Sequence, residues 1–216
     1  MTSHLLSFIV FLPLVGALLV LLVPNRDEKG AAMVRQLGLV VSLVVFFFTL
    51  LLWGKFDASS ADFQFVEQAS WIPAFGIDYH LGVDGISLLL IVLTGFLTPI
   101  SLLSSWESVE KKTKEFTFFV LALEAAMLGV FVSLDLFLFY VFWDAMLIPM
   151  YFLIGIWGYD RRIYAAIKFM RDIEGQGAQR HAREQHGPIP RVGSRQPKRA
   201  DAHRKVVRLR GPIQQQ

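Results

Sequence analysis

Cysteine is absent from this chain of 216 residues. Its absence excludes a disulfide, a thiolate nucleophile and a cysteine-ligated iron–sulfur cluster built from this chain alone. The sequence also has no glycine-rich phosphate loop, no spacing typical of a zinc site and no Ser-His-Asp arrangement. We therefore expect no metal site and no cofactor-binding residue in the chain.

Charged residues are scarce in five long apolar segments. Each has about 20 mostly apolar residues, enough to cross a bilayer as a helix; the segments cover residues 5–23, 37–53, 86–103, 116–134 and 136–157. No Lys or Arg precedes the first segment, and Pro24-Asn25-Arg26 after it is not a small-residue cleavage site, so we interpret it as a retained span rather than a signal peptide. The sequence predicts an all-α integral membrane protein, with five transmembrane helices in a membrane domain of residues 1–169.

The connections between these segments differ in positive charge. The connection 54–85 carries only Lys55, and the turn between the fourth and fifth segments carries no Lys or Arg. The remaining basic residues near the spans lie in the connections 24–36 and 104–115 and after the fifth segment: Arg26, Lys29, Arg35, Lys111, Lys112, Lys114, Arg161, Arg162 and Lys168. Because loops rich in Lys and Arg stay on the cytoplasmic side, we predict that the N-terminus is outside and that the C-terminal side of the fifth helix is in the cytoplasm.

Two carboxylates lie near the middle of apolar spans, Glu124 in the fourth and Asp144 in the fifth. An acid at mid-bilayer costs about 2.5–3.5 kcal/mol on insertion scales and often marks an ion or proton pathway. The two spans are joined by a tight turn at Asp135, which predicts similar depths for the two acids and a shared bundle interior. The alternative is structural: each acid pairs with a lysine of a neighbouring helix or forms a polar contact between helices.

Lys168 follows the fifth span at the start of another apolar stretch. A lysine there is either an anchor that extends its ammonium to the interface or a buried relay lysine, and the residues alone leave both open. Asp84 and Ser87 precede and begin the third span, where the spacing predicts a helix cap rather than a catalytic pair.

Several stretches together resemble one family, the subunit M (chain 4) family of proton-pumping NADH–quinone oxidoreductase, respiratory complex I. The resemblance covers residues 1 to about 169. It is carried by residues 79–87 (YHLGVDGIS), 123–131 (LEAAMLGVF), 139–143 (FYVFW), 148–158 (IPMYFLIGIWG) and 161–169 (RRIYAAIKF).

The resemblance implies an antiporter-like helical bundle in the membrane arm of the complex, in contact with other membrane-arm subunits and the lipid bilayer. Such a subunit holds no redox centre, because NADH, FMN, the iron–sulfur clusters and quinone belong to other parts of the assembled complex. The residues that match the family's proton-translocating groups are Glu124, Asp144 and Lys168. The family has Glu at position 144, and Asp withdraws the carboxyl by one methylene, about 1.5 Å. A bacterial inner (plasma) membrane is the implied location.

A basic tail follows from residue 170. Residues 170–216 contain 11 Lys or Arg against 4 Asp or Glu and show no hydrophobic periodicity, so we predict that they are disordered. The abrupt change within a helical pattern is typical of translation in a shifted reading frame. Aromatic residues that would stack on bases are not interleaved with the tail's charges, so we predict no nucleic-acid partner.

Two other functions are compatible with these residues. A subunit of a multi-subunit sodium/proton antiporter would share the fold, although residues 148–169 favour the oxidoreductase family. A truncated, non-functional membrane fragment is the other alternative, because five helices alone lack partners for a transmembrane path.

Overall fold

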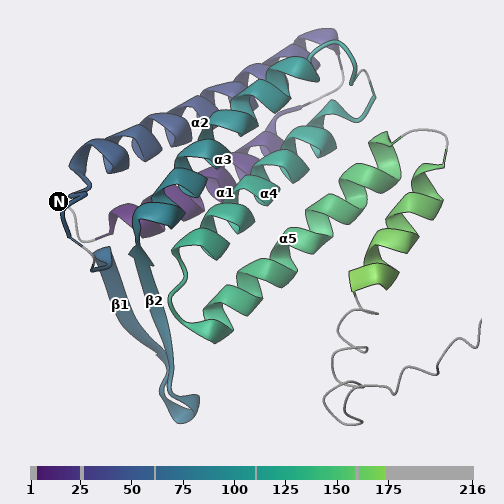
Figure 1. Ribbon diagram of the computed structural model, residues 1–216. Coiled ribbons are helices and arrows are strands. Elements are labelled where there is room, and N and C mark those ends of the chain that lie inside the picture. Colours follow the sequence, from purple (N-terminus) through teal and green to yellow (C-terminus); the bar gives the residue numbers. More distant parts are fainter. Residues whose placement is uncertain (1–3, 25–26, 61, 110, 159–160, 174–216) are drawn as a thin grey trace, which may run out of the picture. The chain divides into compact units, whose positions relative to one another are not determined.

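The computed structural model describes residues 4–24, 27–60, 62–109, 111–158 and 161–173. Five long helices account for most of this part (Figure 1). They are α1 (Leu5–Leu22), α2 (Glu28–Lys55), α3 (Gly85–Ser104), α4 (Thr113–Val132) and α5 (Leu136–Trp157). All five are long and apolar enough to cross a membrane, which confirms the prediction of five spans in an integral membrane protein.

The second helix is longer than the predicted span of residues 37–53. It begins at Glu28 and includes Lys29 and Arg35, which the sequence analysis placed in a connection. Hydropathy marks the part of a helix that fits the apolar layer, and a helix continues beyond that layer wherever its backbone hydrogen bonds continue.

The connection between α2 and α3 forms a β-hairpin that the sequence analysis did not predict. Strand β1 (Gln64–Ile72) pairs with β2 (Ile77–Val83) in an antiparallel, two-stranded sheet. A short 3₁₀ turn (Pro73–Phe75) joins them, followed by Gly76 at φ 65°, a left-handed conformation that glycine adopts without strain. The hairpin extends from the end of the bundle at which α1 and α3 begin (Figure 1).

Backbone and side-chain hydrogen bonds attach the hairpin to the helices at two places. The carboxylate of Glu67 on β1 accepts hydrogen bonds from the backbone N–H of Leu6 (2.7 Å) and from the Ser7 hydroxyl, both at the start of α1. The backbone N–H of Leu134, in the turn between α4 and α5, donates to the His80 carbonyl of β2 at 2.9 Å. The hairpin therefore links the N-terminus of α1 to the α4–α5 turn.

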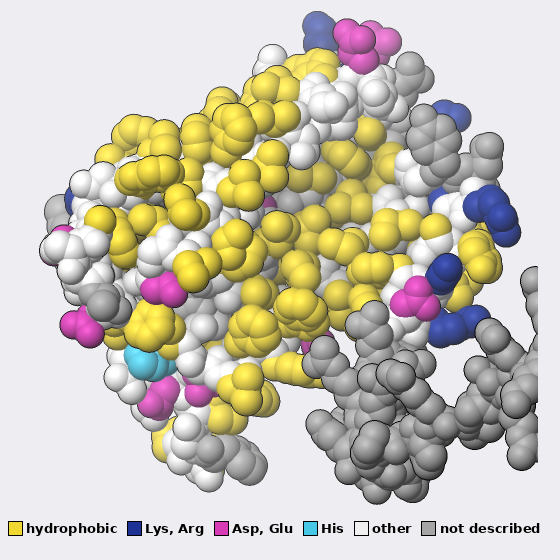
Figure 2. Space-filling model, viewed as in Figure 1, with side chains coloured by type: hydrophobic (Ala, Val, Ile, Leu, Met, Phe, Trp, Pro, Cys, Tyr) yellow, Lys and Arg dark blue, Asp and Glu magenta, His cyan; other side chains and the backbone are white. Residues whose placement is uncertain are grey.

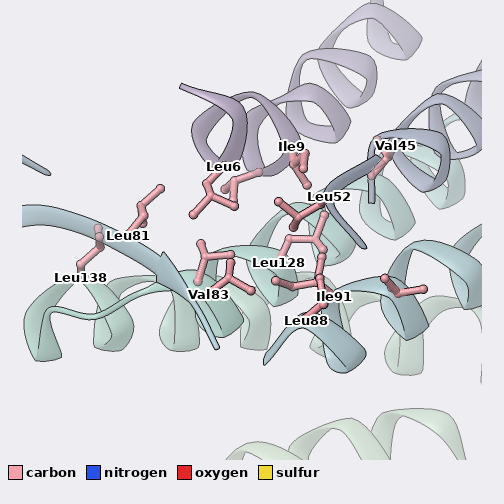
Figure 3. Packing of buried hydrophobic residues seen from close by; sticks show 13 residues of the cluster. Leu6, Ile9, Val45, Leu52, Leu81, Val83, Leu88, Ile91, Leu128 and Leu138 are labelled. Atoms are coloured by element: carbon pink, nitrogen blue, oxygen red, sulfur yellow. The ribbon is translucent and has the colours of Figure 1, made fainter. Parts of the chain in front are cut away.

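The buried apolar residues form two clusters. The larger lies at the hairpin end, where side chains from α1 to α5 and from β2 meet; Leu6, Leu52, Leu81, Ile91 and Leu128 belong to it (Figure 3). The smaller cluster joins α1, α2, α3 and α4 toward the opposite end and includes Val20, Val34, Leu102 and Leu121. Thus α1, α2, α3 and α4 are held together over most of their length, whereas α5 buries little of its own surface.

After α5, residues 162–173 form a further helical stretch that contains Lys168. The first residues assigned to the tail, 170–173, belong to this stretch. Residues 174–216 lie outside the described residues, so the disordered basic tail stays a prediction.

Candidate functional site

Glu124 lies inside the bundle. It is on the face of α4 that also buries Leu121, Ala125 and Leu128, and only 1% of its surface is exposed. Eleven residues separate it from Thr113 at the start of α4, which is about 16 Å along a helix. Within the described part of the chain, neither carboxylate oxygen of Glu124 has a hydrogen-bond partner. The described residues therefore do not show the ion pair between Glu124 and a lysine of a neighbouring helix that was the structural alternative.

A hollow of about 340 Å³ adjoins Glu124. We call it the Glu124 hollow; α3 contributes Thr94, Leu97, Thr98 and Ser101 to its wall. Apart from Glu124, the rest of the wall is apolar and comes from α4 and from Leu153 of α5. Thr98 is the hydroxyl residue beside the Glu124 carboxyl.

Asp144 lies on an exposed face of α5, not in a shared interior with Glu124. The packing of α5 on α4 explains this position. Leu138 and Pro149 are the buried residues of α5, and Phe142 contacts Gly129 of α4 so closely that a Cβ on that glycine would collide with its ring. Because successive helical residues are rotated by about 100°, Asp144 is turned roughly 200° away from Phe142. The prediction of a shared interior is therefore wrong for the described residues.

Asp144 belongs to an exposed stripe of α5 that is otherwise apolar. Tyr140, Ile148 and Phe152 flank it at intervals of four residues, and all of them are exposed. This stripe is part of the surface of α5 that neither α4 nor the hairpin covers.

Lys168 is exposed on the helical stretch 162–173. In the described residues, no hydrogen bond or ion pair joins any two of Glu124, Asp144 and Lys168. Their roles remain predictions, to which the structure adds that Glu124 alone is enclosed by this chain.

The cap of α3 is confirmed. The Ser87 backbone N–H donates to the Asp84 carboxylate at 2.7 Å, and the Asp84 backbone N–H donates to the Ser87 hydroxyl oxygen at 3.0 Å. These hydrogen bonds from Ser87 hold the pKa of the Asp84 carboxyl below its ordinary value. Asp84 thus stabilises a helix start, as its position before an apolar run predicted.

Glu67 is a buried acid that the sequence analysis missed, with 6% of its surface exposed. Its partners on α1 are about 60 residues away in the sequence, so no local pattern indicates this cap. Within the described residues, no group of three or more His, Cys, Asp or Glu side chains could hold a metal ion.

Comparison with known proteins identifies the family. Residues 5–132 match the family described as "NADH-ubiquinone oxidoreductase chain 4, amino terminus", which is more than half of the chain. The chain belongs to this chain 4 family. Residues 133–172 match a second description, "NADH:quinone oxidoreductase/Mrp antiporter, TM". The resemblance expected for residues 1 to about 169 is thereby confirmed.

Relatives in the chain 4 family are much longer than this chain. Subunit M of NADH-quinone oxidoreductase from Rhodobacter capsulatus is 49% identical over 169 residues, which cover 77% of this chain and 32% of the relative. Chain 4 of NADH-ubiquinone oxidoreductase from Arabidopsis thaliana is 43% identical over 165 residues, covering 76% of this chain and 33% of the relative. The chain therefore spans about a third of the length of these relatives.

Solved structures show the same fold. A chain of respiratory complex I from Thermus thermophilus, solved with bound NADH, superimposes with a TM-score of 0.63 at 27% identity, covering 76% of this chain and 32% of that chain. An archaeal membrane-bound sulfane sulfur reductase gives a TM-score of 0.60 at 21% identity, covering 76% of this chain and 24% of that chain; at this identity the likeness concerns the fold alone.

Proposed function

We propose that this chain is part of a membrane-arm subunit of NADH–quinone oxidoreductase and that it couples electron transfer from NADH to quinone with proton translocation. The observation that carries the proposal is the enclosed, unpartnered carboxyl of Glu124 beside a hollow within a membrane span. Such a carboxyl can bind and release protons. An acid at this depth in a membrane costs free energy, so an acid without a function is rarely found there. Family membership supports the same function.

In this proposal Glu124, Asp144 and Lys168 are the proton-carrying residues. An acid facing lipid costs about 2.5–3.5 kcal/mol, which supports contact of the exposed Asp144 stripe with other parts of the assembled complex. The partners are other membrane-arm subunits and the lipid bilayer. NADH, FMN, iron–sulfur clusters and quinone bind elsewhere in the complex.

The location and orientation belong to the same proposal. The membrane is a bacterial inner membrane, with the hairpin end outside and the α3–α4 connection in the cytoplasm. The support is the position of Lys and Arg, which lie mainly toward the end of the bundle away from the hairpin (Figure 2).

The test is a set of substitutions in the complete subunit within the assembled oxidoreductase. Asp144→Asn keeps the side-chain shape and removes the ionisable carboxyl, so we expect proton pumping to fall at least about a hundredfold, the low end of the contribution of a proton-transferring group. NADH oxidation by an artificial electron acceptor should be unchanged, since it does not require the membrane arm. Proton uptake by membrane vesicles measures the effect.

The matched controls are Asp144→Glu, which restores the residue typical of the family, and Asp62→Asn in the exposed connection before the hairpin. Both should pump as the unchanged protein does. Normal pumping by the Asp144→Asn variant would remove Asp144 from the mechanism.

A multi-subunit sodium/proton antiporter is the second candidate, because residues 133–172 match a description that names the Mrp antiporter as well. Deletion of the complete subunit distinguishes the two functions. Loss of sodium-dependent growth at alkaline pH, with quinone reduction intact, would favour the antiporter; loss of quinone-linked proton pumping supports the oxidoreductase.

A further inference from the structure

An open pocket of about 600 Å³ lies at the end of the bundle where α5 ends and α4 begins. Three cationic side chains contribute to its wall: Lys111 and Lys112 from the α3–α4 connection, and Arg162 from the start of the helical stretch 162–173. Among the described residues, no Asp or Glu lines it. We call it the basic pocket. Its volume falls within the range of about 300–1,000 Å³ that small-molecule sites have in proteins.

Hydrogen bonds connect the parts of the chain that form the basic pocket. The indole N–H of Trp157, at the end of α5, donates to the Lys111 carbonyl at 3.2 Å. The Arg162 guanidinium donates to the Ile156 carbonyl at 3.1 Å. A guanidinium has five N–H groups, so Arg162 retains donors for a ligand after this bond. The α3–α4 connection and the stretch after α5 are thus both attached to the last turn of α5.

The rest of the wall is mostly apolar. Ile156, Trp157 and Ile163 lie beside the cationic groups. The Trp157 ring also packs edge-on against Phe116, with 5.3 Å between the ring centroids. Trp157 is the last residue of α5, and tryptophan at the end of a membrane span lies at the level of the lipid headgroups. The basic pocket therefore combines a cationic side with an apolar side at the depth of the membrane–water interface.

The positive-inside rule offers a simpler explanation for positive charge at this end of the bundle. That rule accounts for Lys and Arg within a connection, but it does not require cations from separate connections to meet. Lys112 and Arg162 are about 50 residues apart in the sequence and line the same pocket. Because like charges repel, their convergence is unfavourable unless an anion lies between them.

The position of Lys112 adds to this unfavourable charge. It is the N-cap residue of α4, where the helix dipole disfavours a cation. Its φ of 57° is a left-handed conformation that is uncommon for a lysine. In the described part of the chain, no side-chain hydrogen bond caps the start of α4. An anion in the basic pocket would offset the positive charge there.

We propose that the basic pocket binds the headgroup of an anionic phospholipid, with Lys111, Lys112 and Arg162 on the phosphate and with Ile156 and Trp157 against the glycerol and the first methylene groups. Lys and Arg are the side chains that bind phosphate oxygens most strongly. A lipid fits better than an acidic protein segment, because an amphiphile uses both the cationic and the apolar side at the interface. The proposal does not depend on proton translocation.

Photo-crosslinking tests the site in the complete subunit within the assembled complex. After exchange of co-purified lipid in detergent, the complex is placed in phosphatidylcholine vesicles that contain a photoreactive phosphatidylglycerol or a photoreactive phosphatidylcholine. Both carry the reactive group near the top of one acyl chain, and mass spectrometry identifies the labelled peptides. On the peptide that contains the end of α5, we expect phosphatidylglycerol to give at least about fivefold more label, the effect of one Lys or Arg near an anionic surface.

Lys112→Asn is the variant that best separates charge from folding. It removes the ammonium and places at φ 57° a residue that tolerates the left-handed conformation, so α4 should keep its start while the preference for phosphatidylglycerol falls. Combining it with Lys111→Gln and Arg162→Gln should abolish the preference. Lys29→Gln is the matched control, because Lys29 is exposed in the first turn of α2 and does not line the pocket. Equal labelling by the two lipids in the unchanged protein, or an unchanged preference in both pocket variants, overturns the proposal.

Two other occupants give different results, and each would also overturn the proposal. Loss of the lipid label on addition of inorganic phosphate, but not of sodium chloride at the same ionic strength, would identify a site for free phosphate. Coupling of Lys111 or Lys112 to a carboxylate of a neighbouring subunit by a carbodiimide, without lipid label, would identify an acidic protein segment. We expect neither result, because the apolar side of the pocket contributes to binding a lipid and to neither alternative.

Discussion

At the scale of single residues, Glu67 shows how the hairpin is tied to the bundle. Its carboxylate meets the backbone N–H groups of Leu6 and Ser7, two of the groups at a helix start that have no partner within the helix. A negative charge at this position also complements the helix dipole. Ser7 extends the contact, because its hydroxyl oxygen lies 2.8 Å from the Tyr79 hydroxyl of β2.

Glu67→Ala should loosen the start of α1. Loss of a helix cap costs about 0.5–2 kcal/mol, so we expect faster amide hydrogen exchange at Leu6 and Ser7, measured by mass spectrometry of the peptide from the start of α1. Gln68→Ala is the control, because Gln68 is exposed and, among the described residues, its side chain bonds only to Asp78 across the hairpin. Unchanged exchange in Glu67→Ala would show that the cap contributes nothing.

The sequence predicted where Glu124 and Asp144 lie along their helices but not which way their side chains point. Their positions within apolar spans indicated that Glu124 and Asp144 are costly in a membrane and are therefore candidates for function. Which way each points depends on helix packing, and the contact of Phe142 with Gly129 turns Asp144 outward. That contact joins two helices, so the sequence of α5 does not indicate it. The same limit applies to Glu67, whose partners are distant in the sequence.

At the scale of elements, the α4–α5 pair depends on a small residue at its crossing point. In lipid the hydrophobic effect does not drive helices together, so their association depends on van der Waals packing. Glycine permits this packing because it lets two helices approach one another closely. Gly129 has this role: an added Cβ would overlap the ring of Phe142. A larger residue must push α5 away or move the ring out of its position.

Gly129→Ala should therefore destabilise the α4–α5 pair by about 1–3 kcal/mol, the usual cost of overpacking. A lower midpoint of thermal unfolding in detergent is the expected result for the complete subunit. Gly54→Ala in α2 is the matched control, because nothing lies within 4 Å of a Cβ added there, and it should leave the midpoint unchanged or raise it. Equal midpoints for the two variants would contradict close packing at Gly129.

The helices were predictable from the sequence and the hairpin was not. Hydropathy located all five spans because each is a local run of apolar residues. The hairpin depends on pairing between residues such as Gln68 and His80, and that pairing is interrupted by register shifts. Its strands have mostly exposed or half-buried residues, so they lack the clear alternation that predicts a strand.

At the scale of the whole molecule, charge divides the bundle into two ends. The hairpin end carries Asp57, Glu67, Asp78 and Asp84 and has Lys55 as its nearby cation among the described residues. The other end holds the basic residues in the first two turns of α2, in the α3–α4 connection, in the first turn of α4 and after α5: Lys29, Arg35, Lys111, Lys112, Lys114, Arg161 and Arg162. An apolar surface lies between the two ends (Figure 2). This arrangement is the pattern that the positive-inside rule predicts for a membrane protein.

The proposed orientation rests on this division of charge and can be measured with two cysteines. Ser70 on β1 and Ser108 in the α3–α4 connection are both exposed, and they lie at opposite ends of the bundle. In cells with an intact inner membrane, a thiol reagent that does not cross membranes should label Ser70→Cys, whereas Ser108→Cys should be labelled only after the membrane is made permeable. Labelling of Ser108→Cys alone in intact cells would contradict the proposed orientation and place the basic end of the bundle outside.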